Sequence, residues 1–184
     1  IADPAVGRLV HDQRAARAGL GLAQASTSTT DVRIDDWSLV RDGEGYRARV
    51  DARGFAFDLA FRGTQPVLLQ GERGVSRKGP LPGQASGYYS VPQLAIDGTI
   101  AVSGADHAIA GRGWLDHEWS SAYVPPEAAG WDWIGVNLDD GGALMAFRMR
   151  GREGGTFWAG GTLRDASGRV RTYGPDDVTF APGR

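Results

Sequence analysis

The sequence predicts an all-β protein made of antiparallel β-barrels of the up-and-down type. Three observations lead to this prediction. Short runs with a period of two recur at intervals of about 8–12 residues, which is typical of sandwiches and barrels. Turn residues separate these runs, and Gly accounts for 28 of the 184 residues. No long segment has the 3.6-residue apolar period of an amphipathic helix.

The first predicted strands lie between residues 31 and 62. In residues 31–36, Val32 and Ile34 alternate with polar neighbours, and a second alternating run covers residues 46–51 after the turn dipeptide at 42–43. Residues 54–62 (GFAFDLAFR) place four apolar side chains on one face, which is a strong strand pattern. Residues 73–87 are rich in Gly, Pro and Ser and are predicted to form a loop.

Three hairpins are expected in the rest of the chain. They join residues 88–96 to 99–103 through Asp97-Gly98, residues 131–138 to 143–150 through 139–142, and residues 156–163 to 169–173 through 166–168. Asp-Gly between two β-rich runs is a strong hairpin pattern. Because consecutive strands are joined by short turns, lipocalin-like barrels fit the pattern best.

A domain boundary is predicted between residues 123 and 124. Residues 120–130 (SSAYVPPEAAG) contain paired prolines and no periodicity, which is typical of a linker. The resulting domains are residues 1–123 and residues 124–184. The second is short for a domain with an independent core.

Composition excludes several classes of function. The 20 basic and 22 acidic side chains give a net charge of −2, which argues against a nucleic-acid partner. No segment approaches the roughly 20 apolar residues of a transmembrane helix. The absence of Cys excludes disulfides, thiolate metal sites and Cys nucleophiles. The chain begins at Ile1, and no secretory leader is visible in it.

The candidate site with the most chemistry is residues 111–119 (GRGWLDHEW), which contain two indoles, an imidazole and two carboxylates. Side chains alternate along an extended strand. We therefore expect one face to carry Trp114, Asp116 and Glu118, and the other to carry His117 and Trp119.

This residue set suits acid-catalysed addition of water to a double bond. Asp116 and Glu118 repel each other when both are ionised, so one should have a raised pKa in a dry site. A carboxyl that stays protonated near neutral pH can act as a general acid. An indole beside it, from Trp114 or Trp119, can stabilise a carbocation by about 0.5–2 kcal/mol. His117 would position the attacking water.

A structural role for the same residues is the main alternative. The motif could close a barrel end or glue two domains together, with each carboxylate paired to an Arg. A metal site on Asp116, His117 and Glu118 is disfavoured because adjacent strand residues point apart. No phosphate-binding loop, dinucleotide fingerprint or G-x-S-x-G motif occurs. We expect no metal and no cofactor.

Five segments of the sequence resemble the AttH-like, carotenoid 1,2-hydratase-like family. They are residues 35–39 (DDWSL), 68–79 (LLQGERGVSRKG), 87–104 (GYYSVPQLAIDGTIAVSG), 111–119 (GRGWLDHEW) and 130–150 (GWDWIGVNLDDGGALMAFRMR). The resemblance covers residues 18–173 and implies two lipocalin-like barrels. Residues 1–123 would be the C-terminal part of the first barrel, and residues 124–184 the start of the second. The resemblance thus implies an incomplete chain, or missing strands supplied by another polypeptide.

The resemblance also implies a function. Family hydratases add water to isoprenoid double bonds without a cofactor, which makes a hydro-lyase acting on a hydrophobic isoprenoid or polyene the leading hypothesis. Members are often described as secreted hydrolases, and some accompany ABC transporters. A periplasmic or secreted location is therefore expected. A non-catalytic carrier of an apolar ligand, associated with such a transporter, is the alternative. The strand at 143–150 lacks the downstream Tyr and Asp of the hydratases, which weighs against carotenoid hydration itself.

The predicted site residues fall into two groups. The predicted catalytic residues are Asp116, His117 and Glu118. The residues predicted to bind the hydrophobic substrate are Tyr88, Tyr89, Trp114, Trp119, Trp131 and Trp133.

Overall fold

A computed structural model describes residues 1–3, 7–122, 124–181 and 183. These described residues form fifteen β-strands and no helix, so they contain no helix that could cross a membrane. The strands pair in an antiparallel manner. The prediction of an all-β, antiparallel fold is therefore confirmed.

The chain divides into two compact units. Unit 1 comprises residues 1–64 and 95–112, and unit 2 comprises residues 65–94 and 113–184. The long strands β10 (Ala85–Val102) and β11 (Ala105–Trp119) each contribute one part to each unit. The domain boundary expected at residues 123–124 concerns the two barrels implied for the family, and it stays a prediction.

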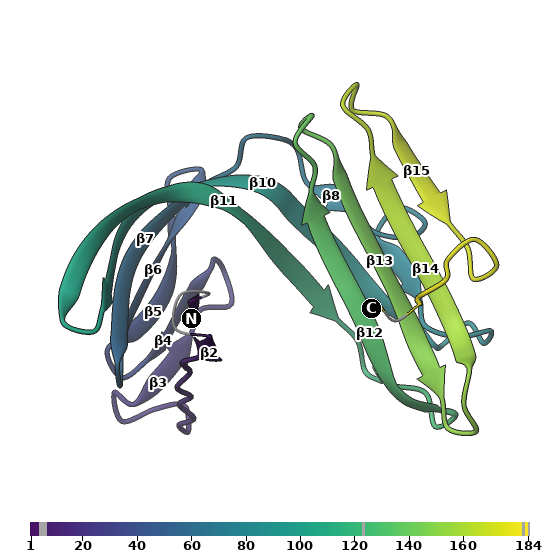
Figure 1. The fold of residues 1–184 in the computed structure, drawn as a ribbon. Coiled ribbons are helices and arrows are strands. Elements are labelled where there is room, and N and C mark those ends of the chain that lie inside the picture. The colour runs from purple at the N-terminus through teal and green to yellow at the C-terminus, as the bar shows by residue number, and fades with distance from the viewer. Residues whose placement is uncertain (4–6, 123, 182, 184) are drawn as a thin grey trace. The chain divides into compact units, whose positions relative to one another are not determined.

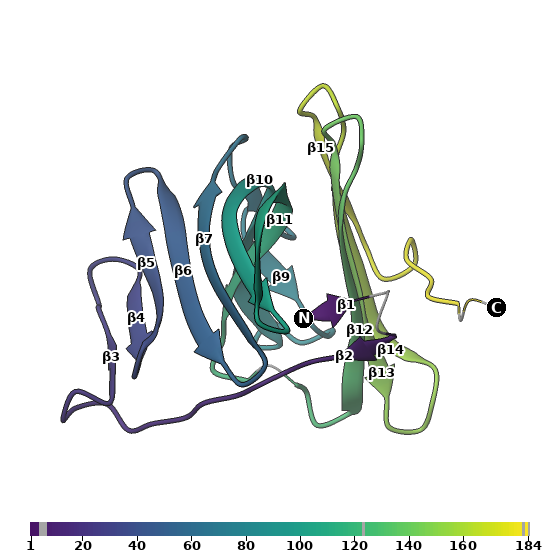
Figure 2. The same cartoon turned by 60° about the vertical axis from the view of Figure 1, so that its left-hand side comes forward.

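Unit 1 is built on one antiparallel sheet. Its strand order is β3-β4-β5-β6-β7, followed by the later part of β10 and the early part of β11 (Figures 1 and 2). A two-stranded ribbon of β1 and β2 precedes the sheet. The strands are β1 (Ala2–Asp3), β2 (Arg8–Leu9), β3 (Ala23–Ala25), β4 (Asp31–Ile34), β5 (Trp37–Asp42), β6 (Gly45–Ala52) and β7 (Phe55–Arg62).

The alternating pattern of the sequence accounts for the centre of this sheet. Phe55, Phe57, Leu59 and Phe61 occupy alternate positions of β7 and therefore share a face, as predicted. On the intervening positions, Asp58 receives hydrogen bonds from Arg47 at 2.6 and 2.8 Å. The β5–β6 hairpin turns at Gly43, whose φ is +58°.

The hairpin expected at Asp97-Gly98 is not formed. Residues 95–102 run straight through this dipeptide and pair without interruption with β7. Gly98 has a φ of +147°, and a Cβ at this position would overlap the carbonyl of Asp58. Its role is therefore to allow close approach of two strands. The turn comes later, where Ser103 (φ 54°) and Gly104 (φ 79°) form the two-residue loop between β10 and β11.

Unit 2 contains a four-stranded sheet of order β12-β13-β14-β15 (Figure 1). The first part of β10 also lies in this unit and pairs with two short strands. The strands of the unit not yet given are β8 (Leu68–Leu69), β9 (Val75–Arg77), β12 (Ala128–Asn137), β13 (Ala143–Gly151), β14 (Thr156–Arg164) and β15 (Val170–Tyr173). The hairpins predicted for residues 131–150 and 156–173 are confirmed.

The core of unit 2 lies between β10 and the inner face of β13. Met145, Phe147 and Met149 occupy alternate positions of β13 and are at most 5% exposed. They pack with the buried Tyr88 of β10. Gln93 fastens β10 to the β12–β13 turn, because its Nε2 donates to the carbonyls of Leu138 and Gly142 at 2.8 Å. These contacts bring the β10–β11 motif against the four-stranded sheet within unit 2.

Candidate functional site: an indole-walled pocket with a buried ion pair

The alternation expected for the 111–119 motif is present in β11. On one face, the carboxylate of Asp116 accepts a hydrogen bond from Ser90 Oγ at 2.5 Å and another from Trp114 Nε1 at 2.8 Å. Glu118 on the same face accepts one from Ser86 Oγ at 2.5 Å. Ser86 and Ser90 are an even number of residues apart in β10, so their side chains lie on the same face of the strand. The carboxylates of Asp116 and Glu118, which they contact, therefore also lie on one face of the β10–β11 pair.

Glu118 also forms an ion pair with Lys78. The Nζ atom of Lys78 lies 2.8 Å from Oε1 of Glu118 and donates to Ser76 Oγ at 3.0 Å. The Lys78 side chain is only 8% exposed. It also lies 4.1 Å from the centre of the Phe147 ring. Burial lowers the pKa of Lys78, while the hydrogen bond and the charge of Glu118 act in the opposite direction.

This ion pair opens onto a pocket of about 310 Å³. The pocket is in the size range of small-molecule sites, and its wall is largely aromatic and apolar. It is lined by Lys78, Tyr88, Glu118, Trp131, Trp133, Phe147 and Met149. All seven residues belong to unit 2. The pocket thus combines an ammonium–carboxylate pair with an indole-rich wall.

Tyr88 connects the two sides of the pocket. Its hydroxyl oxygen accepts a hydrogen bond from Trp133 Nε1 at 3.1 Å. The Trp133 ring packs edge-on against Trp114, with a centroid separation of 6.3 Å. Burial, reinforced by the negative charge of Asp116, raises the pKa of Tyr88. Tyr88 therefore presents a neutral phenol to the pocket at neutral pH.

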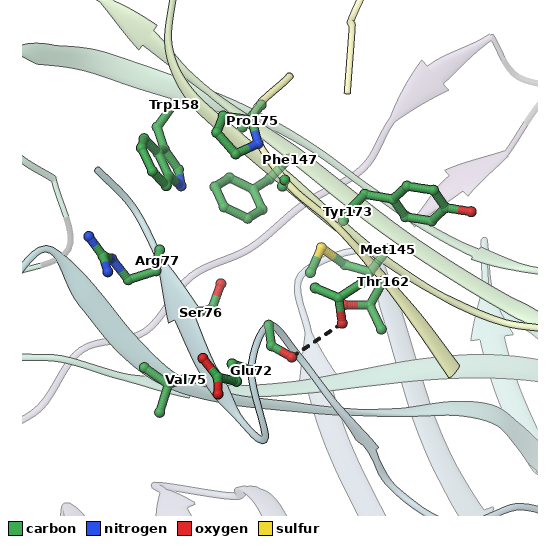
Figure 3. A pocket seen from close by; sticks show the side chains of 16 residues that line it. Glu72, Val75, Ser76, Arg77, Met145, Phe147, Trp158, Thr162, Tyr173 and Pro175 are labelled. Atoms are coloured by element: carbon green, nitrogen blue, oxygen red, sulfur yellow. Dashed lines mark hydrogen bonds between the residues drawn. The ribbon is translucent and has the colours of Figure 1, made fainter. Parts of the chain in front are cut away.

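A second pocket, of about 210 Å³, shares Phe147 with the first. Figure 3 shows the side chains that line this second pocket, with Phe147 among them. Met145, Trp158 and Arg77 also line it. The hydroxyl of Thr162, another lining residue, is fully buried and has no hydrogen-bond partner among the described residues. Ser76, which binds Lys78, contributes to this second pocket. The described residues contain no cluster of His, Asp and Glu that could hold a metal ion.

The family model for AttH-like proteins matches residues 1–184. The chain belongs to the AttH-like family. A search of curated proteins finds no match.

Two solved structures are similar to this AttH-like chain. One is a crystal structure of a protein assigned as an AttH from Nitrosomonas europaea, with 53% identity and a TM-score of 0.94 over 100% of the chain. The other is kievitone hydratase from Nectria haematococca, with 16% identity and a TM-score of 0.65 over 79% of the chain. The second likeness shows a shared fold. The chain spans 57% of the Nitrosomonas protein and 46% of the hydratase.

The structure brings only some of the predicted site residues together. Tyr88, Glu118, Trp131 and Trp133 line the 310 Å³ pocket. Trp114 lies behind this wall, in contact with Trp133. Asp116 does not line this pocket and is bound by Ser90 and Trp114.

The other three predicted residues, Tyr89, His117 and Trp119, form a separate aromatic cluster on the other face of the β10–β11 pair. His117 Nδ1 lies 3.3 Å from the hydroxyl of Tyr89, and the His117 ring packs edge-on against Trp119 at 5.2 Å. Trp119 is 54% exposed, and its indole lies over Gly87. None of these three side chains lines the pocket that contains Glu118.

Sequence reasoning missed Lys78, Phe147 and Met149 as pocket residues. Phe147 and Met149 lie in the strand predicted over residues 143–150, but a strand pattern does not reveal which residues line a pocket. Lys78 lies within residues 73–87, which are predicted to form a loop. The sequence does contain one signal for this residue: among the 20 basic side chains of the chain, Lys78 is the only lysine.

Proposed function

We propose that this AttH-like protein is a cofactor-independent, hydratase-like enzyme that adds water to a double bond of a hydrophobic isoprenoid or polyene-type molecule. The observation that carries the proposal is the Lys78–Glu118 pair, which lies at the surface of an indole-walled pocket. A purely structural pair of carboxylates would be expected to bind Arg and to face no cavity. Glu118 lines the pocket and forms an ion pair with a lysine, Lys78.

The contacts favour different roles for the two carboxylates. Glu118 lines the pocket and can exchange a proton with a bound molecule. Asp116 does not line it and is bound by Ser90 and Trp114, so it acts as a positioning residue. On a double bond with no conjugated electron acceptor, Glu118 first gives a proton to one carbon, and the double-bond electrons form the new C–H bond. Water then attacks the carbocation left on the other carbon, and the carboxylate of Glu118 takes the proton that this water loses. The indoles of Trp131 and Trp133 hold the apolar part of the substrate.

Isotope labelling tests this proposal. The protein is incubated with isoprenoid and polyene alkenes in ¹⁸O-labelled water, and the products are analysed by mass spectrometry. We expect a product that has gained one water with labelled oxygen. Glu118→Gln should lower its formation about 100-fold or more, as is usual for loss of a general acid–base group. Glu153→Gln makes the same chemical change at an exposed turn position and should have no effect. Equal rates in Glu118→Gln and the wild type would refute the proposal.

A second candidate function is a non-catalytic carrier of an apolar ligand, in a periplasmic protein that works with an ABC transporter. It is favoured by the hydrogen bonds that both carboxylates already accept. Such hydrogen bonds can hold the side chains of a binding pocket in place in a protein that catalyses no reaction. Extraction of a tightly bound apolar molecule from the purified protein, without turnover of any alkene, would favour the carrier over the enzyme.

A further inference from the structure

The ammonium group of Lys78 has more N–H donors than the described residues supply with oxygen acceptors. An ammonium carries three N–H groups. Within the described part of the chain, two oxygens accept from it, namely Ser76 Oγ at 3.0 Å and Glu118 Oε1 at 2.8 Å. Its other close neighbours are the rings of Phe147 and Tyr88, at 4.1 and 5.1 Å from their centres. A ring face is a weaker partner than an oxygen, so a ligand oxygen that enters the pocket can compete for the third donor.

The charge of the pocket determines which oxygen fits. Glu118 neutralises Lys78, and the other lining side chains carry no charge. An anionic ligand would gain from Lys78 but would be repelled by Glu118 at the same time. A neutral carbonyl oxygen accepts a hydrogen bond without this repulsion. The pair therefore favours a neutral acceptor over an anion.

The pocket is also divided into a polar and an apolar side. Lys78 directly follows β9, Tyr88 lies in β10 and Glu118 lies in β11, whereas the apolar residues come from β12 and β13. Trp131 and Trp133 are 57% and 41% exposed, so their indoles offer ring surface to a ligand. A flat ligand can lie against these indoles while its oxygen points to Lys78, which lies beside the Phe147 ring.

We propose that the pocket binds neutral, flat, hydrophobic carbonyl compounds, with the carbonyl oxygen accepting a hydrogen bond from Lys78. This proposal rests on the proposed function and names its substrate class. As water adds to a double bond conjugated with the carbonyl, its proton goes to Glu118 and the double-bond electrons move onto the carbonyl oxygen beside Lys78. The enolate then takes the proton from Glu118 at carbon, which restores the ion pair and completes the addition of one water.

The presence of lysine at this one position agrees with a role in donating a hydrogen bond to a carbonyl oxygen. Every other basic side chain in the protein is an Arg, yet the pocket contains the compact ammonium of Lys78. A guanidinium is larger and keeps its charge, whereas an ammonium is a small donor with three N–H groups. Burial lowers the pKa of Lys78, and this makes its N–H groups better hydrogen-bond donors.

Matched probe ligands test the binding mode without requiring turnover. The probes are 2-acetylnaphthalene, 2-ethylnaphthalene and 2-naphthoate, which share one ring system and differ in the oxygen. Their dissociation constants are measured by calorimetry or fluorescence. We expect the ketone to bind at least 5-fold more tightly than the hydrocarbon and the carboxylate. In Lys78→Met, the preference for the ketone over the hydrocarbon should disappear, with hydrocarbon affinity unchanged within 2-fold.

The single lysine provides a second measurement on the wild-type protein, which guards against a Lys78→Met variant that does not fold. With ¹⁵N-labelled lysine, one Nζ resonance is expected, and the ketone should shift it whereas the hydrocarbon should not. Equal affinity for ketone and hydrocarbon, tightest binding of 2-naphthoate, or an unshifted Nζ resonance would each overturn the proposal. Failure of the hydration assay alone would overturn the enzyme function and leave these binding results intact.

Discussion

The Nζ atom of Lys78 lies 2.8 Å from Oε1 of Glu118, at the wall of a pocket in which the lysine side chain is almost fully buried. The two residues come from distant parts of the sequence, one directly after β9 and the other near the end of β11. Breaking a buried pair by removing one partner is costly because the other charge loses its compensation. This contact therefore contributes to stability, and the proposed hydration would use it for proton transfer.

We predict that Lys78→Met destabilises the protein more than Lys78→Met combined with Glu118→Leu. The single variant leaves the Glu118 carboxylate with Ser86 but without its ammonium, and we expect a loss of about 1–3 kcal/mol in the free energy of unfolding. The double variant also removes the carboxylate that has lost its ammonium partner and should recover part of the loss. Urea unfolding of both variants measures the difference. Wild-type stability in the single variant would contradict the prediction.

The pKa of Lys78 should be measurable directly, because its Nζ is the only lysine nitrogen in the chain. Burial lowers this pKa below the ordinary lysine value, and Glu118 opposes the shift. We therefore predict that Glu118→Gln lowers the pKa further. A lowered lysine pKa means that stability rises as pH increases from the folded-state pKa toward the unfolded-state value. Titration of the ¹⁵N-lysine resonance at an ordinary or raised pKa would contradict this account.

We predict that Thr162→Val stabilises the protein. The hydroxyl of Thr162 is fully buried without a hydrogen-bond partner in the described part of the chain, and valine has nearly the same shape. Removing an unsatisfied buried hydroxyl should raise the free energy of unfolding by about 1 kcal/mol. Thr172→Val is a control, since this exposed hydroxyl donates to the Gly71 carbonyl at 3.4 Å. Thermal unfolding compares the two, and a lower melting temperature in Thr162→Val would contradict the prediction.

Asp58 should contribute pH-dependent stability to unit 1. Hydrogen bonds from Arg47, and then from Arg49, lower the pKa of Asp58 to about 2. A depressed carboxyl pKa stabilises the fold above the unfolded-state value, and this contribution is lost as pH falls from about 4 to 2. Because these groups are more than a third exposed, we expect Asp58→Asn to cost about 0.5–1 kcal/mol at pH 6. The difference should vanish near pH 2.

Asp106→Asn, at an exposed position of β11, serves as the control for Asp58→Asn. It should unfold like the wild type at both pH values. Denaturant unfolding at pH 6 and pH 2 provides the comparison. A destabilisation of Asp58→Asn that is the same at both pH values would show that loss of packing, rather than loss of charge, is responsible.

Gly87→Ala should displace the indole of Trp119. A Cβ on Gly87 would overlap this ring, which lies over the glycine and is itself more than half exposed. Because the indole can move outward, we expect a change in its environment with a loss of less than about 2 kcal/mol. Near-ultraviolet circular dichroism should show altered aromatic bands, with His117 and Tyr89 affected as neighbours of Trp119. An unchanged aromatic spectrum would contradict the predicted contact.

Local pattern was enough to predict the strands with strict alternation. The row from Phe55 to Phe61 and the row from Met145 to Met149 both lie on one face of a strand, as their spacing requires. The same period correctly separated Glu118 from His117. It failed at Asp97-Gly98, because a dipeptide that favours a turn also permits the close strand approach that β7 imposes on Gly98.

The sequence by itself determined the all-β class, the alternation of the two faces of β11, and membership of a family that its motifs resemble. These properties depend on neighbours along the chain, since side-chain direction in a strand repeats every two residues. Tertiary structure alone decided that Lys78 meets Glu118 and that Phe147 and Met149 complete the pocket. Such contacts join segments that are far apart in sequence, and only the packing of the unit 2 strands around a common core brings them together.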